Sequence, residues 1–415
     1  MNALAPPHTS PEPPSPANPV LGDGRTTLRR LTLADAAAFA AIHRDPLNIK
    51  WTASQAGMSV REAGGLITGS IDAGWEDGHY LRFGIVDVLG GVQELVGTLS
   101  LQDVVSTRAG GSAGVGIKML PAGRGTGCAQ RAIELLCGYA FGLLGLEILH
   151  WRTTVGNEAS AALARRCGFV LAARIPGYGH VDGQVADGLL FTRTREQCDA
   201  QDAPAGSAAK EMPDAAADVL DIQAVVPVLR GDTVLLRALT MDDAPALVEN
   251  CLDPEAVRWT TVPLDYTLEH AEHFINILVP EGWRSGETLT FAVADPATDG
   301  LLGTVDLQCR APGAAAVGIN LGPRARGTGA AEAGVRLLLD YAFNQLNLSY
   351  VHWSALVPNW GSRKLAWKLG FRLDGEIRGD YNDRGIPSDR WILSLAAGEE
   401  QSPQGPWAGP APASR

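Results

Sequence analysis

Cysteine is scarce and scattered in this sequence. None of its six cysteines forms a C-x-x-C pair, and no cluster of cysteine and histidine has the spacing of a zinc site. We therefore expect no bound metal. Isolated cysteines in a chain of 415 residues are typical of a reducing compartment, so we expect a cytoplasmic protein.

Long apolar runs and excess positive charge are also missing. No run approaches the ~20 residues that a membrane-spanning helix needs, and no basic-then-apolar signal segment is present, so we expect neither a membrane protein nor a secreted one. The formal net charge is −12, which is the wrong sign for a dedicated nucleic-acid binder. An acidic surface instead favours cationic partners such as amines.

Hydrophobic residues make up 46% of the chain, enough to form buried cores, and the length suggests two or three domains. Three stretches rich in proline, alanine and small polar residues interrupt this composition. The expected organisation is a disordered tail at 1–20, a domain at 21–197, a linker at 198–222, a domain at 223–397 and a disordered tail at 398–415.

The two expected domains repeat one another. The segment LRRLTLAD at 28–35 matches LRALTMDD at 236–243, and PAGRGTG at 121–127 matches PRARGTG at 323–329. Ungapped comparison of 121–169 with 323–371 gives 22 identities in 49 positions. A repeat of about 175 residues is far longer than a solenoid period and indicates a duplicated domain.

Each block has the pattern of a mixed α/β (α+β) domain. A short alternating strand is followed by an Ala-rich helical stretch, which begins near Asp35 in one block and near Asp243 in the other. Two strands, a further strand, a glycine-rich turn and an amphipathic helix come next. A strand, a short helix and a hairpin complete each block.

The strongest local motif is R-x-x-G-x-A, which directly follows a strand and opens a helix at 124–129 and again at 326–331. Glycines at such a turn point successive backbone N–H groups into one concavity, and the helix N-terminus adds the positive end of its dipole. A pyrophosphate is the natural occupant. The motif is neither a Walker A loop nor the G-x-G-x-x-G of a dinucleotide fold.

A second pair of positions repeats with it. Asn157 and Ser160 follow the first motif at the same distance at which Asn359 and Ser362 follow the second, and Gly-Phe closes each pattern. Together these residues resemble the GNAT superfamily of acyl-CoA-dependent N-acyltransferases. The ending Lys-Leu-Gly-Phe at 368–371, with DGEIR at 374–378 and Asp389, is similar to the ribosomal-protein N-terminal acetyltransferase branch.

The resemblance covers both blocks and implies two tandem GNAT-type domains, each a mixed, mostly antiparallel sheet flanked by helices. It implies acetyl-CoA or another acyl-CoA as co-substrate and no metal. In the second block the implied cofactor-binding residues are Ile319, Asn320, Leu321, Arg326, Gly327, Thr328, Gly329, Ala330, Ala331 and Asn359. In the first block they are Ile117, Lys118, Met119, Arg124, Gly125, Thr126, Gly127, Cys128, Ala129, Asn157 and Ser160.

The implied chemistry is direct attack of an amine on a thioester, for which a base must take a proton from the amine. Many relatives place a Glu just before the binding strand, but the positions here hold Gly114 and Ala316. Asp306 is our first candidate for the base; the alternative is a hydrogen-bonded strand aspartate. The first block has Ser100 at that position.

Two more side chains complete the catalytic candidates. Ser362 would lie near the sulfur, and it also fits a helix cap. Tyr381, like Tyr178, lies in the last hairpin, where its hydroxyl could face the acceptor, although an exposed hairpin tyrosine is the favoured interpretation. We interpret His352 and its match His150 as packed strand histidines. Tyr341 and Tyr139 fit the core of the long helix.

The sequence thus predicts transfer of an acetyl or other acyl group to a primary amine of a peptide or small molecule. The second block keeps the fuller pattern, including Glu332, and is expected to be the catalytic half. Two alternatives stay open: a long-chain acyltransferase of natural-product assembly, and a non-catalytic acyl-CoA sensor or scaffold. Because the duplication can itself supply a pseudo-dimer, both a monomer and a homodimer fit.

Overall fold

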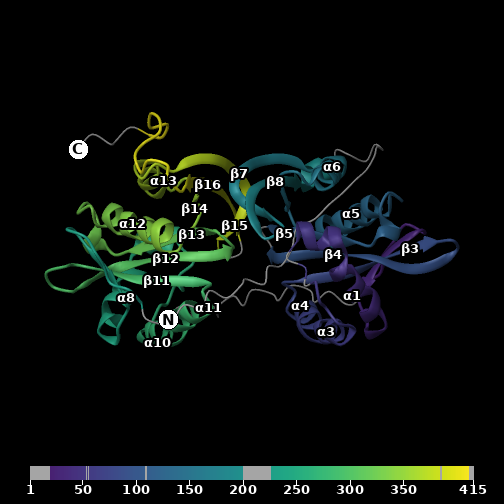
Figure 1. The fold of residues 1–415 in the computed structure, drawn as a ribbon, viewed down its shortest axis with the longest axis horizontal. Coiled ribbons are helices and arrows are strands. Elements are labelled where there is room, and N and C mark those ends of the chain that lie inside the picture. Colours follow the sequence, from purple (N-terminus) through teal and green to yellow (C-terminus); the bar gives the residue numbers. More distant parts are fainter. Residues whose placement is uncertain are drawn as a thin grey trace, which may run out of the picture.

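The computed structural model describes residues 19–52, 54, 56–107, 110–199, 226–383 and 386–410. They form two eight-stranded sheets, one in each half of the chain, with helices on both faces (Figure 1). In each sheet one central pair of strands is parallel and the other pairs are antiparallel. The predicted mixed, mostly antiparallel α/β architecture is therefore confirmed in both halves.

The first half has the strand order β1-β2-β3-β4-β5-β6-β8-β7. Its strands are β1 (Leu21–Gly22), β2 (Thr26–Arg30), β3 (Leu81–Leu89), β4 (Val92–Thr107), β5 (Gly110–Met119), β6 (Ile148–Thr154), β7 (Val170–Val181) and β8 (Gln184–Thr194). Its helices are α1 (Ala36–Arg44), α2 (Pro46–Trp51), α3 (Val60–Leu66), α4 (Asp72–Asp77), α5 (Cys128–Gly138), α6 (Glu158–Arg166) and α7 (Arg195–Asp199).

The second half repeats this order as β9-β10-β11-β12-β13-β14-β16-β15. Its strands are β9 (Leu229–Arg230), β10 (Leu235–Arg237), β11 (Thr288–Ala294), β12 (Leu301–Ala311), β13 (Ala314–Leu321), β14 (Tyr350–Leu356), β15 (Arg372–Asp383) and β16 (Ile386–Ala396). Its helices are α8 (Ala244–Cys251), α9 (Pro254–Trp259), α10 (Leu268–His273), α11 (Val279–Ser285), α12 (Ala330–Asp340) and α13 (Trp360–Lys368).

The same local interactions begin the helical layer of both halves. Thr240 and Asp243 form a capping box, and Arg237 on β10 donates to both oxygens of Asp243 at 2.7 and 2.9 Å. In the first half Arg29 makes the same two hydrogen bonds to Asp35, both at 2.8 Å. Bidentate pairs of this kind fix the helix entry to the neighbouring strand.

Alternation along the central strands divides each sheet into two faces. On β13, Ala315 and Val317 point into the core beneath α12, where Tyr341 is buried as predicted. Asn320 lies on the other face, where its amide donates to Cys251 of α8. The first half repeats this arrangement, with Tyr139 buried above β5.

The two halves meet through β7 and β15, whose strands lie side by side at the centre of the molecule (Figure 1). His150 bonds through Nε2 to the carbonyl oxygen of Arg378 at 3.1 Å, and His352 bonds to the carbonyl oxygen of Pro176 at 2.8 Å. Both pairs are related by the sequence offset of 202 residues. The contact therefore has the reciprocal pattern of a two-fold dimer interface within one chain.

The segment expected as a C-terminal tail differs from that expectation. Its residues 398–410 are described, and Trp407 packs against Trp360 and Trp367 of α13. Arg336 of α12 also donates to the carbonyl oxygen of Gln401 at 2.8 Å. The expectation followed the proline and glycine content, and it missed the large apolar surface of one tryptophan.

The N-terminal tail up to residue 18 and the linker from 200 lie outside the described residues. Among the helices that the structure describes, none has the length and apolar character needed to cross a membrane.

Candidate active site

Each sheet opens at its centre, where the two parallel strands separate. In the second half β13 and β14 are paired from Ala314 with Tyr350 to Val317 with Trp353. Beyond Val317, residues 318–321 pair only with β12. In the first half the parallel pairing of β5 and β6 ends at Gly114. One edge of each binding strand thus presents backbone N–H and C=O groups to a gap in the sheet.

The glycine motif lies at the head of the helix that follows this opening. Gly327 and Gly329 have φ values of 73° and 84°, and Gly125 and Gly127 have 75° and 79°. This left-handed backbone favours glycine. The N-cap residue of α12 and of α5 is a glycine, and the hydroxyl of the preceding threonine accepts from the first N–H of each helix, at 3.2 Å from Ala330 and 3.3 Å from Cys128. A Cβ at Gly327 or Gly329 would meet nothing within 4 Å. The space beside Gly327 and Gly329 is therefore open at a helix N-terminus, the kind of position at which helices bind pyrophosphate.

The arginine of each motif turns away from this space toward a carboxylate. Arg326 pairs with Asp253, the N-cap of α9, and its Nη1 donates at 3.2 Å. Arg124 pairs with Asp45 in the same way. These arginines tie the loop to the N-terminus of a helix, so they position the loop rather than point into it.

The carboxylate partners stay ionised. The hydrogen bond from Arg326 holds the pKa of Asp253 below its usual value. Burial raises the pKa of Asp45, but Arg124 and two backbone N–H groups outweigh it, and the net shift is downward. Asp45 and Asp253 were not identified from the sequence as partners of the motif arginines. The repeat of Asp45-Pro46 as Asp253-Pro254 was a signal that could have indicated them.

The predicted Asn and Ser residues lie together at the start of the short helix in each half. Asn359 caps α13 by accepting from the N–H of Ser362 at 3.0 Å, and the Ser362 hydroxyl accepts from the indole of Trp353 at 3.0 Å. In the first half the N–H of Ser160 donates to Asn157 at 3.3 Å, and the Ser160 hydroxyl accepts from the indole of Trp151 at 3.3 Å. The Nδ2 of Asn157 is buried without a partner, which fits a site for an amide carbonyl.

Asp306 lies on β12 beside the opening of the second half. It is paired in register with Gly318, the first residue of β13 beyond the parallel pairs. A Cβ at residue 318 would overlap with both of its carboxylate oxygens, so the carboxylate lies directly over this glycine. Gln308 donates to Oδ1 at 3.1 Å. Ser100, the corresponding residue, likewise accepts from Gln102 at 3.0 Å, and its hydroxyl donates to the carbonyl oxygen of Gly116 at 3.3 Å.

The other predicted strand residues contribute mainly backbone. Ile117 and Met119 are buried in the core, and Ile319 and Leu321 pack against it. Lys118 is buried on the opposite face. Their side chains therefore point away from the gap between the strands, while their backbone borders it.

The histidines and tyrosines do not assemble around Asp306. His150 and His352 are packed between the halves, and burial lowers the pKa of both. Tyr178 is partly buried edge-on against His352, so the interpretation of an exposed hairpin tyrosine is wrong for it. Tyr381 lies on β15, and within the described residues no hydrogen bond joins it to Asp306 or Ser362.

Comparison with known proteins gives one family for both halves. The family model described as an acetyltransferase (GNAT) domain matches residues 25–170 and 233–372. The probable N-acetyltransferase YjcK of Bacillus subtilis is 29% identical over 174 residues, which are 40% of this chain and 96% of that protein. The uncharacterised N-acetyltransferase YoaA of the same organism is 24% identical over 176 residues, covering 42% and 99%.

Solved structures give matches of similar extent. RimJ from Mycobacterium smegmatis, in complex with CoA-disulfide, is 26% identical and covers 41% of this chain and 83% of that one, with a TM-score of 0.37. The ribosomal-protein-S5-alanine acetyltransferase of Vibrio fischeri is 21% identical and covers 42% and 99%, with a TM-score of 0.37.

Proposed function

This chain belongs to the GNAT acetyltransferase family, and from that premise we propose that its C-terminal half transfers an acyl group, in the simplest case acetyl, from an acyl-CoA to a primary amine of a peptide or small molecule. The acyl-CoA supplies an activated thioester. The loop at 326–331 offers N–H groups for its pyrophosphate, and the strand edge at 318–321 offers backbone groups for its pantetheine arm.

The position of Asp306 carries this proposal. Its carboxylate lies over Gly318, where β13 and β14 begin to separate, and it belongs to the face that bears α8. A typical primary amine is protonated at pH 7, so a carboxylate at the opening can both attract the ammonium and take its proton. The acidic net charge of the chain favours the same cationic acceptor.

The proton balance involves two residues of the same half. Asp306 takes one proton from the ammonium, and the resulting amine attacks the thioester carbonyl carbon. A C–N bond forms, the nitrogen of the tetrahedral intermediate releases its second proton to solvent, and the C–S bond breaks. The Ser362 hydroxyl, whose oxygen is held by Trp353, donates a proton toward the leaving sulfur and regains one from solvent.

The first half has different charges at the same positions. In the second half three residues lie side by side across adjacent strands: Thr290, Asp306 and Gly318. The corresponding residues of the first half are Arg82, Ser100 and Gly116. Arg82 is buried there, with its guanidinium over the rings of Phe39 and Tyr80. A fixed cation beside the opening disfavours a protonated amine, which supports assigning catalysis to the second half.

The proposal is tested by following release of free CoA thiol from acetyl-CoA. The acceptors are a peptide with N-terminal alanine, a peptide with N-terminal serine and an aminoglycoside. For the best acceptor, Asp306→Asn should lower kcat by about a hundredfold, within the range for removal of a general base, and leave CoA binding intact. A series of acyl-CoAs of rising chain length then separates acetyl from long-chain transfer.

Ser100→Ala is the matched control, because it changes the corresponding strand position of the first half, and it should leave turnover unchanged. An equal loss in both variants would contradict the assignment to the second half. Full activity of Asp306→Asn would remove Asp306 as the base. CoA binding without thiol release from any acceptor would favour the sensor or scaffold alternative.

A further inference from the structure

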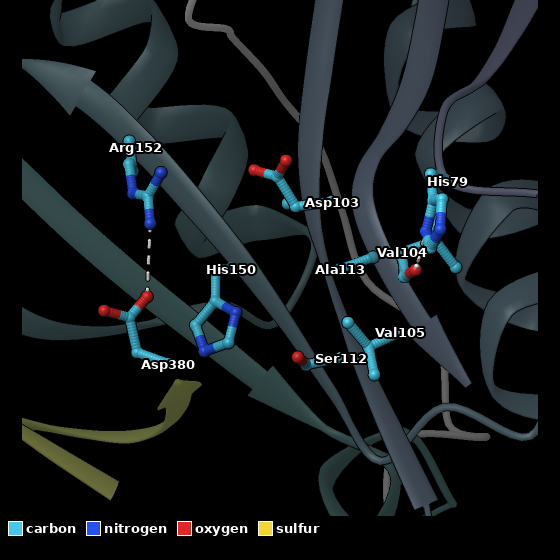
Figure 2. Close-up of a pocket in the computed structure, with 10 residues that line it drawn as sticks. His79, Asp103, Val104, Val105, Ser112, Ala113, His150, Arg152 and Asp380 are labelled. Carbon is cyan, nitrogen blue, oxygen red and sulfur yellow. Dashed lines mark hydrogen bonds and ion pairs between the residues drawn. The ribbon is translucent and has the colours of Figure 1, made fainter. Parts of the chain in front are cut away.

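A cavity of about 380 Å³ lies between the two halves, away from Asp306 (Figure 2). The first half supplies most of its wall from β4, β5 and β6, and the second half supplies Asp380 from β15. Its polar lining residues are His79, Asp103, Ser112, His150, Arg152 and Asp380. The volume is at the lower end of the range that small-molecule sites occupy.

The internal two-fold relation predicts an equivalent position on the other side of the interface. There, Tyr178 of β7 takes the place of Asp380 and packs edge-on against His352, with ring centroids 5.3 Å apart. Tyr350 stacks on the same imidazole at 6.4 Å. The space beside His352 is therefore occupied by aromatic rings, whereas the equivalent space beside His150 is a cavity.

The hollow side carries charges that its counterpart lacks. Arg152 donates to Asp380 at 3.2 Å, and Arg390 pairs with the other oxygen of the same carboxylate. The counterparts of these three residues at the offset of 202 are Ser354, Tyr178 and Gly188. Burying an ion pair costs desolvation free energy, and the other side docks without one. Docking of the halves therefore does not explain these charges.

Both ends of the cavity keep unused binding capacity. Asp103 sits on a bulge of β4 with φ of 48° and is exposed. Within the described residues no hydrogen bond to its carboxylate is found, and its charge helps to raise the pKa of Arg152 across the cavity. His79 holds this bulge through Nδ1 and the carbonyl oxygen of Val104, 3.2 Å apart. Arg152 uses Nη2 for Asp380, its buried Nε has no partner, and 40% of its side chain is exposed.

In Figure 2 the Asp103 carboxylate and the Arg152 guanidinium lie on different strands, with His150 near Asp380 below them. An ammonium matches the exposed carboxylate of Asp103, and a carboxylate matches the guanidinium of Arg152, for which planar oxygen pairs are the best partners. We propose that this cavity binds a small zwitterion, an amino acid or a molecule with the same two head groups. The cavity borders the opening of the first half at Gly114 but uses no residue of the catalytic centre proposed for the second half, so its ligand is separate from that acyl transfer.

The test measures binding to the full chain by thermal shift, with each of the twenty L-amino acids as the probe. For an amino acid that raises the melting temperature, calorimetry then compares it with its decarboxylated amine and its deaminated acid. The zwitterion should bind about tenfold or more tightly than either analogue, because each analogue leaves one charged group of the site unmatched.

Two variants assign the head groups. Arg152→Ser, which introduces the residue of the other side, should weaken the amino acid about tenfold and leave its amine analogue unchanged. Asp103→Asn should weaken the amino acid and leave the acid analogue unchanged. Ser354→Ala on the aromatic side is the matched control and should alter neither. The melting temperature without ligand shows whether each variant is folded.

Three results would overturn the proposal. The first is that no amino acid binds with a Kd below about 10 mM, since weaker binding does not indicate a built site. The amine or the acid alone could bind as tightly as the zwitterion. Arg152→Ser and Asp103→Asn could both leave affinity unchanged. Because binding is the readout, none of these outcomes depends on whether acyl transfer occurs.

Discussion

The Ser362 side chain shows how one residue can combine a structural and a chemical role. Its backbone N–H is capped by Asn359, and its oxygen accepts from Trp353. The bond to Asn359 uses the backbone N–H of Ser362, and the bond from Trp353 uses a lone pair of its hydroxyl oxygen. The hydroxyl hydrogen is therefore left to be donated to another acceptor. The interpretation of Ser362 as the helix cap is wrong, because Asn359 is the cap and the Ser362 hydroxyl accepts from Trp353. Contact of Ser362 with the sulfur stays a prediction.

Asp374 predicts a pH dependence of stability that is independent of catalysis. Burial raises the pKa of its carboxyl to about 6, and one of its oxygens is buried without a partner. The folded protein therefore holds a proton there that the unfolded chain releases at lower pH. Stability from this group is full below its ordinary value near 3.8 and is lost as pH rises through 6.

Asp374→Asn replaces a carboxylate that is costly to bury by a neutral amide. It should therefore raise the free energy of unfolding at pH 7.5 by roughly 1 kcal/mol, a value discounted for partial exposure. The measurement is urea unfolding of both proteins at pH 4.5 and pH 7.5. The difference between variant and wild type should be larger at pH 7.5. The exposed control Asp265→Asn should show a constant difference, and a constant difference for Asp374→Asn would disprove the assignment.

At the scale of elements, the two glycine loops have one design and differ in exposure. The Arg326 side chain is 46% exposed and that of Arg124 is 26% exposed, each against an Asp that is almost buried. Arg326→Glu should lower turnover about a hundredfold or more, because it places a second negative charge beside Asp253 at the mouth of the proposed catalytic donor site.

Arg124→Glu should only weaken turnover, within about threefold, but should lower the melting temperature by several degrees, since the buried Asp45 loses its partner. Steady-state kinetics and thermal unfolding of the two variants give the comparison. Equal losses of activity would mean that the halves share catalysis.

The C-terminal segment 399–410 leads to a second prediction at this scale. Trp407 contacts Trp360, which directly follows Asn359 and packs on Trp391 with ring centroids 4.5 Å apart. Trp407→Ala should free the N-terminal turn of α13 and weaken CoA binding in the second half by roughly threefold to tenfold. Calorimetry with CoA is the measurement, and Arg124→Glu in the background isolates the second half. Unchanged affinity would limit Trp407 to a surface contact.

The order and type of the elements could be predicted because local pattern decides them. Alternation and a 3.6-residue period predict the strand, glycine turn and helix at 316–340, and the structure has β13 and α12 there. The packing of residues 398–410 could not be predicted, because it depends on Trp407 meeting tryptophans some 40 residues away. The partners of Arg124 and Arg326 lie over 70 residues away and were missed for the same reason.

At the scale of the whole molecule, the duplication places a dimer interface inside one chain. Ala173, Ile175 and Ile377 form a small apolar cluster between the halves, and a Cβ at Gly375 would meet Ala173 at 2.8 Å. No local pattern marks such a contact. Aligning the halves at an offset of 202 would have shown where Asp380 and Arg152 replace Tyr178 and Ser354, but not that these positions meet.

The same internal repeat predicts how many CoA molecules the chain binds. Both glycine loops have left-handed glycines and a glycine as the N-cap of the following helix, and Asn157 and Asn359 cap matching helices. We therefore expect two copies of acetyl-CoA per chain, although catalysis is proposed for one half only. Native mass spectrometry of the purified protein titrated with acetyl-CoA measures this without knowledge of the acceptor.

The variants then assign the two copies. Arg124→Glu should reduce the stoichiometry to one and retain turnover, whereas Arg326→Glu should reduce it to one and abolish turnover, because the loops are separate sites with separate consequences. A single copy in the wild type, lost only in Arg326→Glu, would make the first half a scaffold whose loop geometry is retained without a ligand. No bound copy at all would contradict the acetyl-CoA assignment and require longer acyl donors to be tried next.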